Sequence, residues 1–352
     1  MKLFNIVLII SLITTYFTNI SFAQIGGTAT YRFLDLPNSA KAAALGGNNI
    51  TLNTNDINLI HNNPALLNPD MDNNFSINYV PYFADINWGY VAYAKKMKNF
   101  GTLAAGIHYI NYGEFIEADE YGNKTGKFTA AEYAADIVWS KKIDSLWSFG
   151  LNFKPIYSVL ERYTSFGVAV DLGILYYKPS KLFSAALVIK NIGTQIKPYY
   201  KGHYEKIPFD IQFGITKKLE HAPFRISFVA QHLQKPNLNY QIPENQEIIF
   251  DSETQTSKES WYIKYPEMAL RHCIFGMEFI PIQNFNINIG YNFQRRQEMK
   301  LQSKTGFTGF SWGIGIYVKK FQFEYGHSTF SVAGSSNIFS IKVNLNEFIT
   351  KK

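Results

Sequence analysis

Apolar residues alternate with polar or small ones along most of this chain, and this period of two constrains the fold more than any other feature. The run over 285–293 is typical, since Phe, Ile, Ile, Tyr and Phe are separated by Asn, Asn, Gly and Asn. Successive side chains of a β-strand point to opposite faces, so each run predicts a strand with one apolar face. Between about Asn73 and Phe348 we expect strands to begin near residues 74, 85, 100, 128, 146, 165, 182, 208, 223, 268, 284, 307, 320 and 337.

The number and length of these runs predict a closed barrel in a membrane. Many runs exceed the five or six residues typical of a soluble strand and match the tilted span of a membrane strand. Closure leaves no unpaired backbone edge in lipid. A soluble β-sandwich or a propeller is the alternative, but only 17% of the residues are charged, and soluble outer faces carry more charge. We therefore predict an all-β fold, a 14-stranded antiparallel transmembrane outer-membrane β-barrel over 73–352 with a short helical N-terminal plug.

The first 23 residues have the pattern of an export signal. Lys2 supplies a positive start, Leu3–Ile13 is apolar, and Ser21–Ala23 offers small residues at the cleavage positions. The sequence thus predicts a signal peptide over 1–23, a mature chain from Gln24, and a multi-pass barrel in the outer membrane of a Gram-negative bacterium.

Residues 24–72 do not alternate and are expected to form a separate hatch or plug segment. Asn38 is a candidate N-cap for a short alanine-rich helix over 39–45, which two glycines end. A second weak helical stretch covers 56–61. Such a segment either hangs in the periplasm or folds into the lumen, and we predict the lumen because the inward-facing residues of the strands are mostly small and polar.

The longest connections are expected at 113–127, 196–207, 236–267 and 294–306, with no helix between strands. Loop 236–267 carries six acidic residues against two lysines. Aromatic anchors with a polar rim are typical of protein-binding patches, so this loop is the expected docking site. A loop that only shields lipopolysaccharide is the alternative. The candidate partner-binding residues are Tyr240, Phe250, Trp261, Tyr262 and Tyr265.

One short pattern resembles a catalytic motif. Residues 309–313 read Gly-Phe-Ser-Trp-Gly, the spacing of a nucleophile elbow, which needs a strand-to-helix turn with an acid and a His in order. Here the motif lies inside an alternating run, so Ser311 is expected to face the lumen. Glu324 and His327 follow, but they are only three residues apart on the next strand. We expect no catalytic residues.

The histidines and the single cysteine indicate no other chemistry. Cys273 alone cannot form a disulfide framework, and none of the seven histidines is spaced as a metal ligand with another. His108 and His272 are expected on strands as hydrogen-bonded lumen residues, and Cys273 on the lipid side. The scattered basic residues match no nucleic-acid-binding module. We expect no cofactor, no metal, no nucleic acid and no enzymatic activity.

Two segments of the sequence resemble segments of known protein families. Residues 36–47, Leu-Pro-Asn-Ser-Ala-Lys-Ala-Ala-Ala-Leu-Gly-Gly, with Asn-Pro-Ala at 63–65, resemble the N-terminal signature of the FadL superfamily of hatch-bearing barrels. Residues 26–37, Gly-Gly-Thr-Ala-Thr-Tyr-Arg-Phe-Leu-Asp-Leu-Pro, resemble the PorQ-like proteins of type IX secretion, which are related to PorV. The family motif and hatch residues are Gly46, Gly47, Asn63, Pro64 and Ala65.

The narrower resemblance implies a non-enzymatic outer-membrane component of the type IX secretion system. It would tether a PorZ-like surface protein of the attachment complex, beside PorU and PorV, in contact with outer-membrane lipid and lipopolysaccharide. The alternative is a FadL-like transporter of hydrophobic small molecules. Transport would need an apolar pocket, and the expected inward residues, mostly Gly, Asn, Asp, Ser and Gln, suit a hydrated, plugged lumen better.

Overall fold

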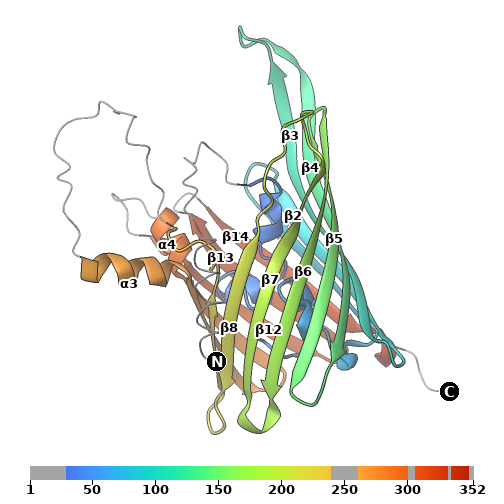
Figure 1. Ribbon diagram of the computed structural model, residues 1–352, viewed down its shortest axis with the longest axis vertical. Coiled ribbons are helices and arrows are strands. Elements are labelled where there is room, and N and C mark those ends of the chain that lie inside the picture. Colours follow the sequence, from blue (N-terminus) through green and yellow to red (C-terminus); the bar gives the residue numbers. More distant parts are fainter. Residues whose placement is uncertain (1–28, 239–260, 300–305, 332–333, 349–352) are drawn as a thin grey trace, which may run out of the picture. The chain divides into compact units, whose positions relative to one another are not determined.

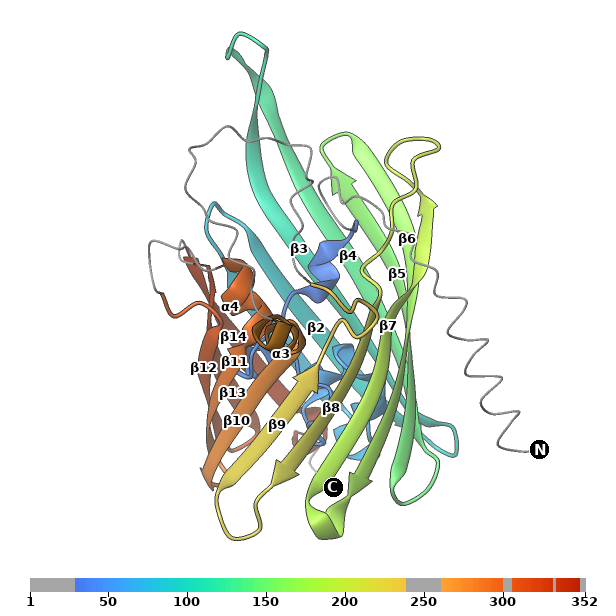
Figure 2. The same ribbon diagram turned by 60° about the vertical axis from the view of Figure 1, so that its left-hand side comes forward.

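The computed structural model describes residues 29–238, 261–299, 306–331 and 334–348, and its fourteen antiparallel strands close into one barrel (Figures 1 and 2). Each strand pairs with its neighbours in the chain, and β1 pairs with β14 to close the ring. The strands are β1 (Asn74–Pro81), β2 (Asn87–Met97), β3 (Gly101–Ala118), β4 (Lys124–Lys142), β5 (Trp147–Leu160), β6 (Tyr163–Lys178), β7 (Phe183–Lys197), β8 (Asp210–Lys218), β9 (Phe224–Ala230), β10 (Cys273–Ile282), β11 (Phe285–Asn292), β12 (Phe310–Val318), β13 (Phe321–Ser331) and β14 (Gly334–Asn344).

The two faces of the strands are inverted relative to a soluble protein. On β11, Asn286 and Asn288 are buried inside the barrel, whereas Ile289 is 42% exposed on the outside. The same contrast separates Ser340 from Phe339 on β14. An apolar outer surface around a polar lumen is the arrangement that lipid requires. The predicted 14-stranded outer-membrane barrel is confirmed.

Two helices interrupt the strands, so the expectation that none would do so was wrong. Helix α3 (Trp261–Arg271) precedes β10, which therefore begins at Cys273 rather than near residue 268, and α4 (Phe293–Met299) occupies part of the expected loop 294–306. Within α3, Tyr262, Tyr265 and Ala269 recur at spacings of three and four residues, which is a helical period. The expected loop 236–267 therefore contained a helical pattern at its C-terminal end. Among the described helices, none is both long and apolar enough to cross a bilayer.

The barrel wall is tall on one side and low on the other. Strands β3 and β4 contain 18 and 19 residues, whereas β8 and β9 contain 9 and 7. The expected loop 113–127 is mostly strand, with only 119–123 outside β3 and β4, and this hairpin stands above its neighbours in Figure 1. Short turns lie at the opposite end, which by the usual orientation of such barrels faces the periplasm. The hairpin end is therefore extracellular.

The final strand is shorter than expected. Strand β14 ends at Asn344, and Leu345–Glu347 form a 3-10 turn, η6, so the expected strand 337–348 was wrong at its C-terminal end. The side chain of Asn344 accepts a hydrogen bond from the backbone N–H of Asn346 at 2.9 Å and starts this turn. Asn residues favour such turns over continued pairing.

A plug of short helices fills the lumen (Figure 2, blue). Its elements are η1 (Arg32–Asp35), α2 (Ala40–Ala44), η2 (Ile57–His61), η3 (Pro64–Leu66) and η4 (Pro69–Met71). Helix α2 packs on β11 to β14, η3 on β4 to β6, and η2 on β1 and β2. The N-cap of α2 is Ser39, which accepts from Ala42 N–H at 3.3 Å, and not Asn38 as predicted. Asn38 instead donates to the carbonyl of Asn58 at 2.5 Å.

Wall glycines let the plug approach the strands. A Cβ on Gly290 would lie 2.2 Å from the backbone nitrogen of Gly46, and one on Gly150 would lie 2.2 Å from the backbone of Pro64. A Cβ on Gly326 would lie 2.4 Å from the carbonyl oxygen of Ala40. Strand glycines of this kind mark places where another backbone comes close. The boundaries 1–23 and 24–72 stay predictions, since residues 1–28 lie outside the described chain.

Candidate functional site at the mouth of the barrel

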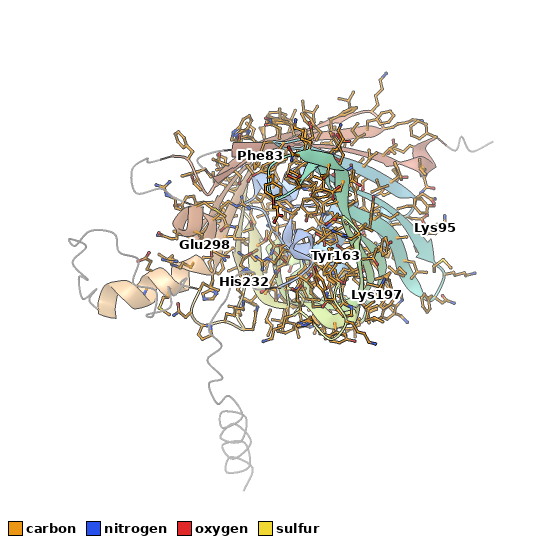
Figure 3. All side chains as sticks on the ribbon, turned by 90° about the horizontal axis from the view of Figure 1, so that it is seen from above. Phe83, Lys95, Tyr163, Lys197, His232 and Glu298 are labelled. Atoms are coloured by element: carbon orange, nitrogen blue, oxygen red, sulfur yellow. The ribbon has the colours of Figure 1, made fainter. Side chains whose placement is uncertain are left out.

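A cavity opens at the extracellular end of the barrel and is called the mouth pocket. It has a volume of about 680 Å³ and lies between the start of the plug, the tops of β3 to β6, and the segment after β7. Figure 3 looks onto this end, with Tyr163 on the side of the mouth away from His232 and Glu298. The lining residues are Ala29, Thr30, Tyr31, Arg32, Tyr112, Phe115, Phe128, Ala130, Glu132, Leu160, Glu161, Tyr163, Tyr199, Tyr200, His203 and Glu205.

A β-bulge in β3 places Phe115 beside Phe128 in this pocket. Between Asn111 and Glu114, β3 has one residue more than β4, and Gly113 lies there at a φ of 81°. A bulge of this kind changes which face later side chains take, so Phe115 joins Phe128 on the inner face. Their rings stack with centroids 5.1 Å apart and planes 15° apart. The tall hairpin therefore contributes an aromatic wall.

The plug forms the floor of the mouth pocket. Tyr31 is 2% exposed, adopts a left-handed backbone with φ of 56°, and forms a short hydrogen bond through its hydroxyl with Ser165 on β6. Phe33 and Ile156 belong to the same buried apolar cluster as Tyr31. The pocket therefore ends on packed side chains.

A buried carboxylate lies in the aromatic wall. Glu132 on β4 is 5% exposed, and the Tyr112 hydroxyl donates to it at 2.6 Å. The Ser158 hydroxyl also hydrogen-bonds to it and in turn accepts from the Tyr199 hydroxyl at 2.5 Å. Burial raises the pKa of Tyr199 to about 12, so this phenol stays protonated and able to donate. No salt bridge joins Glu132 to a basic side chain in the described residues.

A second, smaller cavity at the same end is charged. It has a volume of about 190 Å³ and is lined by groups that include Arg32, Asp35, Lys190, His232 and Arg295. Burial alone would lower the pKa of His232. The hydrogen bond and ion pair of His232 with the carboxylate of Asp210 on β8 outweigh burial, so the pKa of His232 is raised. Burial lowers the pKa of Arg295 to about 10, which leaves it cationic at neutral pH. Arg32 lines both cavities, so the start of the plug separates them.

Below these cavities, a buried ion cluster joins the plug to the wall. The ammonium of Lys41 in α2 lies 3.4 Å from Glu278 on β10 and 3.6 Å from Glu324 on β13, and all three side chains are at most 3% exposed. Arg225 on β9 contacts the other oxygen of Glu278 at 2.9 Å. Two cations and two carboxylates thus balance one another. Charges so deeply buried require partners, so the cluster fixes α2 in place.

A second polar cluster lies on the opposite wall. His61 in η2 contacts Asp136 on β4 at 2.8 Å, and Lys154 on β5 contacts Asp171 on β6 at 2.8 Å. Asn152 donates to Asp136 at 2.8 Å and lies between the two pairs. Sequence reasoning assigned none of these residues to a cluster, although each charged strand residue occupies an inward position of its alternating run, which was the available signal.

The predicted motif residues all lie in the plug. Gly46 and Gly47 have φ of 98° and 101° and end α2, with Gly47 N–H donating to Ala42 at 2.9 Å. Asn63 caps η3 by accepting from Ala65 N–H at 2.9 Å, and its amide donates to Ile50 at 2.7 Å. The structure gives these residues a role in folding the plug against the wall.

The predicted partner-binding residues stay a prediction. Tyr240 and Phe250 lie outside the described residues. Trp261, Tyr262 and Tyr265 belong to the backbone of α3, so the expected loop 236–267 is helical at its end.

Ser311, the serine of the motif that resembles a nucleophile elbow, has a structural role. Ser311 lies within β12 with 1% exposure, donates to the Ala44 carbonyl at 3.0 Å and accepts from Gly46 N–H at 3.0 Å. His327 points to the outer face, where its Nδ1 contacts Asn337 at 2.9 Å. Within the described ranges, no group of three or more His, Cys, Asp or Glu is arranged to hold a metal ion.

Two expectations for histidine were wrong. His108 does lie in the lumen, but both ring nitrogens lack a hydrogen-bond partner in the described chain, because the ring is enclosed by Phe33, His61 and Tyr90. His272 precedes β10 rather than lying on it, and its Nδ1 contacts the Gln231 carbonyl at 2.8 Å.

Comparisons with solved structures identify the architecture. The chain is similar to the toluene transporter TbuX of Ralstonia pickettii, with a TM-score of 0.52, 10% identity, and coverage of 88% of this chain and 99% of that one. The toluene transporter TodX of Pseudomonas putida gives a TM-score of 0.52 and 12% identity over the same shares. The fold is that of the FadL-like outer-membrane barrels. No protein-family model matches the chain, and no curated protein matches it.

These FadL-like neighbours correct the main functional expectation. A type IX secretion component was expected, but the matching structures include the toluene transporters TbuX and TodX, which favours the transporter alternative. They are not enzymes, in agreement with the expectation for this chain. The resemblance to PorQ-like proteins rested on residues 26–37, and the described part of that segment begins the plug. The expected PorZ-like, PorU, PorV and lipopolysaccharide contacts stay predictions.

Proposed function

We propose that the protein takes hydrophobic small molecules across the outer membrane, and that the mouth pocket is where they first bind. The observation that carries this proposal is the aromatic cavity of about 680 Å³ at the extracellular end of a FadL-like barrel. Ligand pockets are mostly apolar cavities of roughly 300–1,000 Å³ with a few placed polar groups, and this one fits that description. The toluene transporters of the same fold support the substrate class.

The plug must shift for a ligand to continue along the lumen. Beneath the mouth pocket, Tyr31, Phe33 and Leu34 are at most 2% exposed, and α2 and η3 contact opposite walls. The plug is joined to the wall by polar contacts, through Lys41 and His61, and by buried apolar clusters such as the one that contains Phe33 and Ile156. Passage of a ligand therefore requires a local opening that breaks both kinds of contact.

Uptake by cells tests the proposal. The protein is expressed in a Gram-negative host whose outer membrane lacks a hydrocarbon channel, and the initial uptake rate of radiolabelled toluene is measured at low concentration. Wild type should raise the rate above vector alone. The double variant Phe115→Ala, Phe128→Ala should lose much of this gain, since losing the contact of one fully buried phenyl ring alone weakens binding by roughly 1.5 kcal/mol or more, about tenfold.

A matched variant on the same hairpin controls for expression and assembly. Ile116 is 57% exposed and does not line the pocket, so Ile116→Ala should transport as wild type does. Equal uptake by vector and wild type, with the barrel present in the outer membrane, would overturn the proposal.

A further inference from the structure

The mouth pocket contains a buried acidic side chain, Glu132, and a neutral hydrocarbon has no charge to pair with it. Glu132 is 5% exposed, yet its described partners are neutral hydroxyl groups, those of Tyr112 and Ser158. Both hydroxyls have a hydrogen to give, and the carboxylate oxygens of Glu132 can accept from each. Filling the pocket with a neutral ligand would enclose this carboxylate without a counter-ion, which is costly in a water-poor site.

None of the other charges around the pocket forms a salt bridge with Glu132 in the described residues, although the Arg162 guanidinium lies 5.8 Å from the centroid of the Tyr163 ring. Arg32 is 3.3 Å from Asp35 and more than half exposed, and the acid Glu161 is already paired with exposed Arg162 at 3.0 Å. Glu205 adds a further acidic group at the rim with no salt bridge in the described residues. The lining is therefore acidic where it is buried.

The aromatic residues supply the second half of a cation site. Tyr163 and Tyr200 pack with ring centroids 4.8 Å apart, and Phe115 stacks on Phe128 across the cavity lining. Ring faces attract a cation that lies within roughly 6 Å, and cages of several rings bind quaternary ammonium groups in this way. Such rings also hold the apolar part of the same ligand.

We propose that the mouth pocket binds a hydrophobic organic cation, an aromatic or alkylated ammonium, with Glu132 as its counter-ion and the tyrosine and phenylalanine rings around its head. This inference rests on the proposed function and narrows its substrate class. Glu132 supplies the charge, and Tyr112 and Ser158 hold its carboxylate in place. The aromatic rings distinguish the alkylated ammonium from a strongly hydrated inorganic cation, which keeps its water.

Binding to the full chain in lipid nanodiscs tests the proposal, with empty nanodiscs subtracted. The probes are benzyltrimethylammonium and its neutral isostere 2,2-dimethylpropylbenzene, in which carbon replaces the charged nitrogen. Wild type should bind the cation at least tenfold more tightly than the isostere. Glu132→Gln keeps an acceptor for Tyr112 and should weaken cation binding about tenfold, with less than a twofold change for the isostere.

Two further variants keep the test decisive. Tyr163→Leu preserves apolar volume without a ring face and should weaken cation binding about threefold, whether or not Glu132→Gln assembles. Glu120→Gln makes the same exchange at the exposed hairpin tip, outside the pocket, and should change nothing. Equal or tighter binding of the isostere by wild type would overturn the cation proposal and leave the proposed function standing. Binding of neither probe would overturn both.

Discussion

Replacement of Lys41 should release the plug helix while the barrel stays closed. Lys41→Met keeps a long apolar stem but removes the ion-pair partner of Glu324, while Glu278 keeps Arg225. Removing one partner of a buried ion pair costs about 3–5 kcal/mol, and the lower end applies here because a freed carboxyl can take up a proton. Since 1.36 kcal/mol is tenfold, α2 should open at least about a hundred-fold more often.

Hydrogen exchange measured by mass spectrometry reports this opening directly. The relevant amides are those of Ala43 and Leu45, which donate within α2 at 3.0 and 3.1 Å. Acidification should restore part of their protection in Lys41→Met, because it neutralises the carboxylate that has lost its cation. Lys98→Met, in an exposed turn, is the matched control and should leave α2 protected. Protection of α2 within threefold of wild type would refute the claim that the ion cluster holds the plug.

Three further outcomes are expected. Ile289→Arg places a cation on the lipid face of β11 and should destabilise folding into vesicles by about 2–4 kcal/mol, measured by urea titration; an unchanged midpoint would contradict the assigned face. Gly290→Val should displace α2 in hydrogen exchange while the barrel still assembles, whereas Gly126→Val, whose nearest atom belongs to a flexible Glu side chain, should not. The raised pKa of His232 stabilises the segment 231–235 below about pH 6.5, the unfolded value, so its amide protection should fall as pH rises through the folded value, and His232→Gln should abolish that pH dependence.

The barrel could be predicted from the sequence because each strand has a single apolar face. Alternation such as that of 285–293 specifies which residues face lipid, because a one-residue slip in strand pairing would put the polar side chains into lipid. Strand starts were therefore found to within a few residues, except where α3 displaced β10 to Cys273. The segment of α3 that shows a helical period is only 11 residues long and contains Pro266, so its sequence was a weak indication of a helix.

The mouth pocket could not be predicted in the same way. Its residues come from positions as distant as Tyr31, Phe128 and Tyr200, and the closed barrel alone brings them together. The bulge at Gly113 that turns Phe115 inward depends on how β3 pairs with β4, which alternation within one strand does not report. The expected polar lumen describes the ion clusters and hydrogen bonds around the plug. It did not predict the aromatic residues of the mouth pocket, which lies on the extracellular side of the plug.

The central claim, that ligands pass from the mouth pocket through a lumen closed by the plug, is tested most directly by a reversible lock. The hydroxyls of Thr51 in the plug and Thr216 on β8 lie 2.6 Å apart, so Thr51→Cys with Thr216→Cys, in a Cys273→Ser background, places two thiols within bonding reach. Toluene uptake by cells carrying this variant is measured before and after reduction. The account predicts that the oxidised form stops uptake and that reduction restores it, whereas equal uptake in both states would contradict passage along the lumen.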